Sequence, residues 1–163
     1  MSFRPRAEAL RRDMLSPVKF FFYQWAQLPL AAFAGLRVVR LDEARCEVAL
    51  PGGWRTQNPF RSTYFAAQFM AAEMSTGAPA LVLSRGGEAS ISMLVQDVRG
   101  RFVKKATGRT LFAFEDVAGM AAVIERAARS GEGEAFVARP SARMTDGTLV
   151  SEFEVTWTFK RRA

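Results

Sequence analysis

The feature that most constrains this chain is a predicted helix from about Ser62 to Gly77 that is apolar on nearly every side. Ser62 or Thr63 can cap its first turn, just after Pro59, which a helix interior does not tolerate. Gly77 and Pro79 are expected to end it. The apolar residues between these limits are Phe65, Ala66, Ala67, Phe69, Met70, Ala71, Ala72 and Met74. Because a helix that is apolar all round is buried all round, the sequence predicts a central helix inside the fold.

Two polar residues interrupt this apolar surface. Gln68 and Glu73 lie roughly 140° apart around the helix axis, so one small site is not expected to use both. A carboxylate on a buried helix is costly unless it is paired, protonated or used in function. Glu73 is therefore the first candidate for a functional residue.

Length and composition favour one globular domain. The chain has 163 residues, 49% of them hydrophobic, and its 14 Phe residues are far more than a disordered chain carries. We expect a single domain over residues 1–163, in which residues up to about 33 form a helical extension.

The charge balance favours anionic partners. The 23 Lys and Arg residues against 16 Asp and Glu residues give a net charge of +7. Phosphorylated cofactors, nucleic acid and acidic membranes all fit such a charge. The basic residues are spread along the chain, however, so we expect no specific nucleic-acid partner.

The sequence has no histidine, which excludes a Ser-His-Asp or Cys-His site and a His-based zinc site. We expect no metal site. Cys46 is the single cysteine, so an internal disulfide is impossible and a reducing cytoplasm is the expected location. Cys46 lies in an alternating strand pattern, where a small buried side chain is its expected role.

The N-terminal region raises the question of a membrane segment. Residues 1–14 are arginine-rich and lack the apolar core of a secretory signal. The apolar run 20–36 is shorter than the roughly 20 residues that span a bilayer, and Gln24, Gln27 and Pro29 interrupt it. We expect no transmembrane segment and favour a docked helix, while interfacial contact with a membrane stays open.

The remaining pattern alternates helices with antiparallel strands. Further helices are predicted over Glu8–Met14, Val18–Leu28 and Val117–Arg129. Strands are predicted over Leu36–Leu50 with a turn at 42–44, Ile91–Val103, Arg109–Phe114, Glu134–Thr145 and Leu149–Lys160. Asp146-Gly147 indicates a tight hairpin between the last two strands. A bulge or bend is expected near Asp97 and Gly100, and Pro140 indicates a bulge or a free edge in its strand. Residues 80–84 fit either helix or strand.

This pattern resembles the hotdog fold of acyl-CoA thioesterases over roughly residues 30–160. The residues that carry the resemblance are Asn58, the segment 61–77, the segment 102–108 and Trp157 in the closing strand. The resemblance implies an α+β hotdog fold, a central helix wrapped by a curved antiparallel sheet. A cone-shaped fold of the cystatin or nuclear-transport-factor type is the architectural alternative.

The resemblance also implies a site. Asn58 and Glu73 are fifteen residues apart, which is similar to the arrangement in phenylacetyl-CoA-type thioesterases, where an Asn precedes a His-Gly-Gly turn and an acidic residue follows on the central helix. The His-Gly-Gly turn of those enzymes is absent, and Tyr64-Phe65-Ala66 takes its place. By analogy Glu73 would be general base or nucleophile, and Asn58 would position water or the thioester. The structural alternatives are an ion pair of Glu73 with an Arg across a subunit contact and a turn-forming role for Asn58.

Further expectations follow from the resemblance. The substrate pocket is expected at Tyr64, Phe65, Gln68 and Phe69, and the coenzyme A phosphates are expected at Arg101, Lys104, Lys105 and Arg109. The substrate is an acyl-CoA or acyl-carrier thioester, with no cofactor beyond the coenzyme A that belongs to it. The chain is expected to form a homodimer or a dimer of dimers.

A second functional class stays open beside the enzyme. The chain is alternatively a non-catalytic acyl or lipid binder, or an assembly subunit, that uses the space lined by Phe65, Phe69, Met70 and Met74. Dehydration or hydration of acyl chains is disfavoured, because hotdog dehydratases use a catalytic His.

Overall fold

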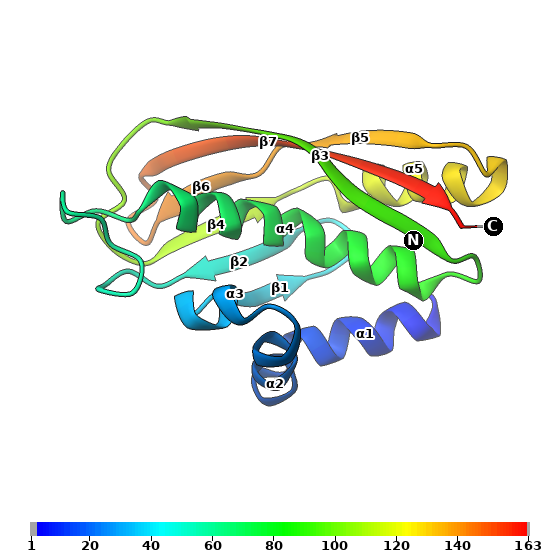
Figure 1. Ribbon diagram of the computed structural model, residues 1–163, viewed down its shortest axis with the longest axis horizontal. Helices are drawn as coiled ribbons and strands as arrows, with labels where there is room; N and C mark the ends of the chain where they lie inside the picture. Colours follow the sequence, from blue (N-terminus) through cyan, green and yellow to red (C-terminus); the bar gives the residue numbers. More distant parts are fainter. Residues whose placement is uncertain (1–2, 163) are drawn as a thin grey trace.

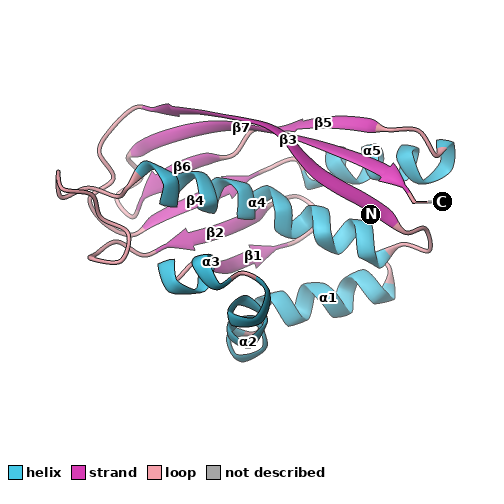
Figure 2. Cartoon of the chain, viewed as in Figure 1, coloured by secondary structure: helices cyan, strands magenta, loops and turns pink. Residues whose placement is uncertain are grey.

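The structure is a computed structural model that describes residues 3–162. Its helices are α1 (Pro5–Leu15), α2 (Pro17–Gln27), α3 (Pro29–Ala34), α4 (Phe65–Gly86) and α5 (Val117–Ser130). Its strands are β1 (Arg37–Leu41), β2 (Cys46–Leu50), β3 (Ile91–Phe102), β4 (Thr110–Phe114), β5 (Glu134–Ala138), β6 (Ser141–Met144) and β7 (Leu149–Arg161). Figures 1 and 2 show the long helix α4 lying across one face of a single curved sheet.

All pairings in the sheet are antiparallel. The strand order is β1-β2-β4-β6-β7-β3, and β5 also pairs with β7. The predicted strand 134–145 is divided at Arg139 and Pro140 into β5 and β6, because proline cannot donate a hydrogen bond to the ladder. Within the described residues β3 pairs only with β7, so one edge of this twelve-residue strand is open.

The predicted central helix is present and buries one side against the sheet. Ala71, Ala72, Ser75 and Thr76 are fully buried. Trp157 of β7 donates a hydrogen bond from Nε1 to Oγ1 of Thr76 at 2.8 Å, which ties α4 to the sheet. A long helix held in the curve of an antiparallel sheet confirms the expected α+β hotdog fold.

The predicted limits of the helix were wrong at both ends. Ser62 bonds to Asn58, and the side chain of Tyr64, the N-cap residue, makes no capping bond. The helix continues through Gly77 and Pro79 to Gly86. Proline removes one intrahelical hydrogen bond, but the following turns bury Ala80 and Val82 completely, so packing outweighs the local stop signal.

The wrapping of α4 is also less complete than predicted. A stripe of half-buried residues runs along α4: Met70, Glu73, Gly77 and Leu81. Met14 of α1 and Met93 of β3 lie beside this stripe, but its residues stay partly exposed. The sheet therefore does not wrap the Glu73 side of α4 completely.

The N-terminal helices form a separate layer below the sheet (Figure 1). Helix α1 packs on α4 and β1, and α2 packs on α1 and α3. Helix α3 was not predicted. Among residues 3–162, no helix combines the length and the apolar character needed to cross a membrane.

The irregularities predicted for β3 fall partly where expected. The register against β7 shifts between Val95 and Asp97, which confirms the predicted bulge near Asp97. No register shift occurs at Gly100. A Cβ there would stand 2.7 Å from the ring of Phe69 and 2.9 Å from the ring of Phe153, so Gly100 leaves room for both rings.

Candidate functional site

A cavity of about 470 Å³ lies beside the open stripe of α4. Its walls come from α1, α2, α3, α4 and β3, and its lining includes Met14, Tyr23, Leu28, Leu30, Met70, Met74, Leu81 and Met93. Glu73 is the only charged residue in that lining. The cavity thus combines an apolar interior of ligand size with a single carboxylate.

The carboxylate of Glu73 has no partner within residues 3–162. It makes no ion pair and accepts no hydrogen bond from these residues. Burial raises the pKa of Glu73 above the ordinary carboxyl value of 4.5. A carboxylate whose pKa is raised in an apolar cavity is suited to accept a proton as a general base.

The backbone of Glu73 is fixed by a short relay of hydrogen bonds. Trp157 donates to Thr76, as described above, and Thr76 donates from Oγ1 to the backbone oxygen of Glu73 at 2.9 Å. The sheet therefore positions the turn of α4 that carries the carboxylate.

The side chain of Asn58 is engaged in its own loop. Its Oδ1 accepts hydrogen bonds from the backbone N of Phe60 at 3.0 Å and from the backbone N and Oγ of Ser62, both at 3.2 Å. The backbone of Arg61, which lies between Phe60 and Ser62, is in the left-handed region with φ 57°. Asn58 therefore shapes the tight loop before α4.

The residues predicted for the substrate pocket divide between two places. Tyr64, Phe65 and Phe69 form a chain of aromatic contacts, with ring centroids 4.8 and 6.2 Å apart, at the N-terminal end of α4. Gln68 lies on the opposite, sheet-facing side and is buried. Its Oε1 accepts a hydrogen bond from Oγ of Ser151 at 2.7 Å, which ties α4 to β7.

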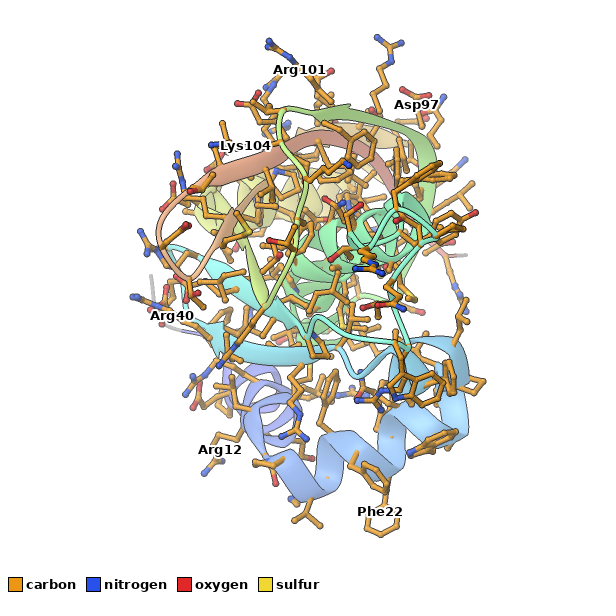
Figure 3. The ribbon with its side chains drawn as sticks, turned by 90° about the vertical axis from the view of Figure 1, so that its left-hand side faces the viewer. Arg12, Phe22, Arg40, Asp97, Arg101 and Lys104 are labelled. Atoms are coloured by element: carbon orange, nitrogen blue, oxygen red, sulfur yellow. The ribbon has the colours of Figure 1, made fainter. Side chains whose placement is uncertain are left out.

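The basic loop after β3 lies next to the N-terminal end of α4. Thr63, two residues before the helix, donates its backbone N–H to the oxygen of Ala106 at 2.7 Å. Lys104 and Lys105, just before Ala106, are both exposed. Figure 3 shows Lys104 near this end of the molecule, and Arg101 projecting outward beyond it.

The two other predicted phosphate ligands, Arg101 and Arg109, lie outside the segment 104–106 that contacts the start of α4. Arg101 is exposed and comes within 3.9 Å of the carboxylate of Glu152. Arg109 is exposed at the start of β4, on the far side of the same loop. Both flank the loop that carries Lys104 and Lys105.

The predicted site residues thus form two groups in one chain. Asn58, Tyr64, Phe65 and the basic loop gather at the N-terminal end of α4. Glu73 lies eight residues further along the helix than Phe65, which corresponds to about 12 Å. The two groups are too far apart in a single chain to act on the same carbonyl carbon.

Sequence reasoning missed the wall of the cavity that α2 and α3 provide. The aromatic residues of α2 signalled a helix that must pack on something, but not where it packs. Tyr23, Leu28 and Leu30 come from α2 and the start of α3, and they meet α4, which is more than thirty residues further along the chain. Met70 and Met74, suspected as pocket residues, do line the cavity beside Glu73.

The fold is similar to that of several solved structures, some of which are described as thioesterases. A Pseudomonas aeruginosa protein of unknown function, described as a probable thioesterase, superposes with a TM-score of 0.70 at 18% identity, covering 99% of this chain and 100% of that one. A Haemophilus influenzae thioesterase gives a TM-score of 0.64 at 14% identity, covering 86% and 88%. Two structures of a Staphylococcus aureus thioesterase, variants with alanine in place of a glutamine and of a glutamate, give TM-scores of 0.61 at 13% and 12% identity, covering 81–82% of this chain and 98–99% of those.

The chain belongs to the DUF4442 family, a domain of unknown function, whose family model matches residues 20–159. No curated protein matches the chain. The match begins within α2, so the helices that line the cavity of Glu73 lie largely inside the family domain.

Proposed function

We propose that this protein is a thioesterase that hydrolyses an acyl-CoA or acyl-carrier thioester, with Glu73 as the general base. The observation that carries the proposal is the carboxylate of Glu73, unpaired within the described chain and with a raised pKa, in an apolar cavity of acyl-chain size. The acyl chain occupies the cavity, and the thioester carbonyl lies at Glu73.

The chemistry requires one water molecule. Glu73 takes a proton from the water while its oxygen attacks the thioester carbonyl carbon, giving a tetrahedral oxyanion. Collapse of the oxyanion breaks the C–S bond and releases the free acid. Glu73 returns the proton to the departing sulfur, so the carboxylate is restored for the next cycle.

The oxyanion needs hydrogen-bond donors, and Tyr23 and Gln27 are the only side-chain donors among the described residues that line the cavity. The first N–H groups of a helix have no acceptor within the helix, so Phe65 and Ala66 at the start of α4 can supply them. Since these groups lie about 12 Å along the helix from Glu73, the complete site joins Glu73 of one chain to the start of α4 of another. The open edge of β3 provides a surface for such a homodimer.

Two further observations support the proposal. Asn58 and Glu73 are separated by fifteen residues, and the same spacing separates the glutamine and the glutamate that were replaced in the two S. aureus thioesterase structures. The exposed Lys104 and Lys105 lie beside the start of α4. In a shared site, this loop can hold the phosphates of coenzyme A while the acyl chain enters the cavity.

The alternative is a non-catalytic acyl binder. Among the described residues that line the cavity, only Glu73, Gln27 and Tyr23 carry polar groups. This lining favours a binder, because a binding pocket for an acyl chain needs no oxyanion donors. Such a protein would retain the apolar cavity and leave Glu73 protonated.

A screen of the purified protein against acyl-CoAs of increasing chain length separates the two functions. Thiol release reports hydrolysis, and calorimetry on the same samples reports binding. Turnover that depends on chain length supports the thioesterase. Saturable binding with no thiol release at any chain length contradicts it and supports the binder.

A further inference from the structure

Helix α2 presents its apolar face to solvent. Its exposed face carries four large apolar side chains, Val18, Phe21, Phe22 and Trp25. The exposed fraction of Phe22 is 67%, whereas that of Gln24 on the inner face is 5%. Gln24 donates a hydrogen bond from Nε2 to the backbone oxygen of Leu36 at 3.0 Å, which fixes this orientation of the helix. A contiguous exposed apolar face of this kind marks an interaction surface.

The aromatic rings on this face lie together. The ring centroids of Phe21 and Phe22 are 5.5 Å apart, and those of Phe21 and Trp25 are 6.3 Å apart. In Figure 3, Phe22 projects from α2 at the bottom of the molecule, whereas Arg101 of β3 lies at the top. Pairing of two chains along β3 therefore does not cover Phe22.

Positive charge concentrates around the same helix. The first 41 residues contain seven Lys and Arg residues and two acidic residues, a net charge of +5 out of +7 for the whole chain. The two acidic residues, Glu8 and Asp13, are already paired with Arg11 and Lys19 at 2.7 and 2.6 Å. Arg40 is paired as well, with Asp42 at 2.7 Å. Arg4, Arg6 and Arg37 have no ion pair within residues 3–162 and leave a net positive charge on this part of the molecule.

One of these cations lies directly beside the aromatic face. Arg37 of β1 is exposed, has no ion pair within residues 3–162, and lines a hollow together with Val18 and Phe21. A cation next to exposed aromatic side chains matches the boundary between lipid headgroups and acyl chains, where Phe and Trp insert and Lys and Arg meet lipid phosphate.

We infer that α2 docks the protein on the surface of an anionic lipid bilayer. Phe21, Phe22 and Trp25 insert at the headgroup boundary, and Arg37 with the other N-terminal cations binds the negative surface. The helix lies in the plane of the bilayer, because its eleven residues are too few to span it.

Docking places the cavity of Glu73 at the membrane. Leu28 and Leu30 line that cavity, and both are also exposed, with exposed fractions of 42% and 70%. An acyl chain can therefore pass from the lipid phase along α2 and α3 to Glu73. This route rests on the proposed thioesterase function, whereas docking itself does not.

Vesicle flotation tests the docking without any activity assay. The full chain should float at low salt with vesicles of phosphatidylcholine mixed with phosphatidylglycerol, and much less with phosphatidylcholine alone or at high salt. Phe22→Ser combined with Trp25→Ser should weaken binding at least about tenfold, because each buried aromatic side chain contributes strongly. Phe60→Ser, at an exposed aromatic residue outside α2, is the matched control and should bind like the parent.

Charge reversal tests the electrostatic part. Arg37→Glu combined with Arg6→Glu should reduce flotation strongly, whereas Arg99→Glu combined with Arg129→Glu, the same change of net charge away from α2, should have a much smaller effect. Unchanged circular dichroism and melting temperature show that each variant is folded.

Three results would overturn the inference. The first is no flotation with anionic vesicles at low salt. The second is flotation that the change at Phe22 and Trp25 leaves unchanged, which would indicate nonspecific adsorption. The third combines two results: the parent does not bind vesicles, and the Phe22→Ser, Trp25→Ser variant has a lower molecular mass by light scattering than the parent. Together they would assign the exposed face of α2 to a contact between copies of this chain.

Discussion

Glu73 and Gly77 lie one turn apart on α4, and a Cβ atom at Gly77 would stand 2.9 Å from Oε1 of Glu73. The same Cβ atom would stand 3.2 Å from the ring of Trp157, so the missing side chain at Gly77 leaves room for both groups. Glycine in a helix interior costs roughly 1 kcal/mol relative to alanine. Here glycine stands directly beside the single carboxylate of α4.

Gly77→Ala should displace the carboxylate while leaving the fold intact. We expect kcat for thioester hydrolysis to fall between about tenfold and a hundredfold, since a shift of about 1 Å in a catalytic group has effects of this size. The unfolding free energy should change by less than about 1 kcal/mol, because alanine favours the helix while its methyl group meets Trp157 at 3.2 Å. In a Glu73→Gln background the same substitution should have no further effect on turnover. A full additional loss there would show that Gly77 acts independently of Glu73.

Thr76→Val should destabilise the protein by about 1–3 kcal/mol, because it leaves the buried Nε1 of Trp157 without an acceptor. Urea unfolding measures the loss. Ser75→Ala is the matched control, because Ser75 is equally buried and donates only to the backbone oxygen of Ala72. Its removal leaves no buried donor without an acceptor, so the loss of unfolding free energy should be smaller. Equal costs for the two variants would contradict the relay from Trp157 to Glu73.

The raised pKa of Glu73 predicts a pH-dependent stability difference. In the folded state Glu73 holds its proton to higher pH than in the unfolded state, where the pKa is near 4.5. The folded state is therefore favoured below that value, and this contribution is lost as pH rises through the folded pKa. Compared with the parent, Glu73→Gln should gain unfolding free energy as pH rises from 4.5 toward neutrality. Denaturant titrations across this range measure the difference, and a constant difference would mean that the pKa is not raised.

The basic loop should contribute to coenzyme A binding. Lys104→Glu combined with Lys105→Glu should weaken acyl-CoA affinity at low salt, with a smaller effect at high salt, because exposed charges are screened. Arg126→Glu combined with Arg129→Glu on α5 reverses the same amount of charge and should leave the affinity close to that of the parent. Affinity that is unchanged at low salt for the Lys104 and Lys105 variant would remove this loop from the site.

The architecture was predictable because it depends on local patterns. The apolar α4, the Asp146-Gly147 hairpin turn and the alternation in β7 each follow from periodicity or turn chemistry, and together they define a helix against an antiparallel sheet. The end of α4 was not predictable in this way. Pro79 is a local stop signal, and the packing that outweighs it, such as the contact of Gly86 with Ala7 of α1, comes from residues far away in the sequence.

The candidate site was predictable only in part for the same reason. Glu73 stands out in the sequence because a buried helix rarely carries a carboxylate. The cavity that it faces depends on Tyr23, Leu28 and Leu30, which reach α4 through a fold-back that no local pattern specifies. The hydrogen bond from Ser62 to Asn58 likewise becomes evident only in the three-dimensional structure of the loop.

The most direct test of the central claim is kcat of Glu73→Gln on the acyl-CoA that the parent hydrolyses fastest. The amide keeps the size of the side chain but cannot accept a proton, so we expect a loss of at least about a hundredfold with the fold retained. Glu47→Gln, at a half-buried carboxylate of β2 that does not line the cavity, is the control and should retain parental turnover. Hydrolysis by Glu73→Gln at the parental rate would contradict the assignment of Glu73 as the general base.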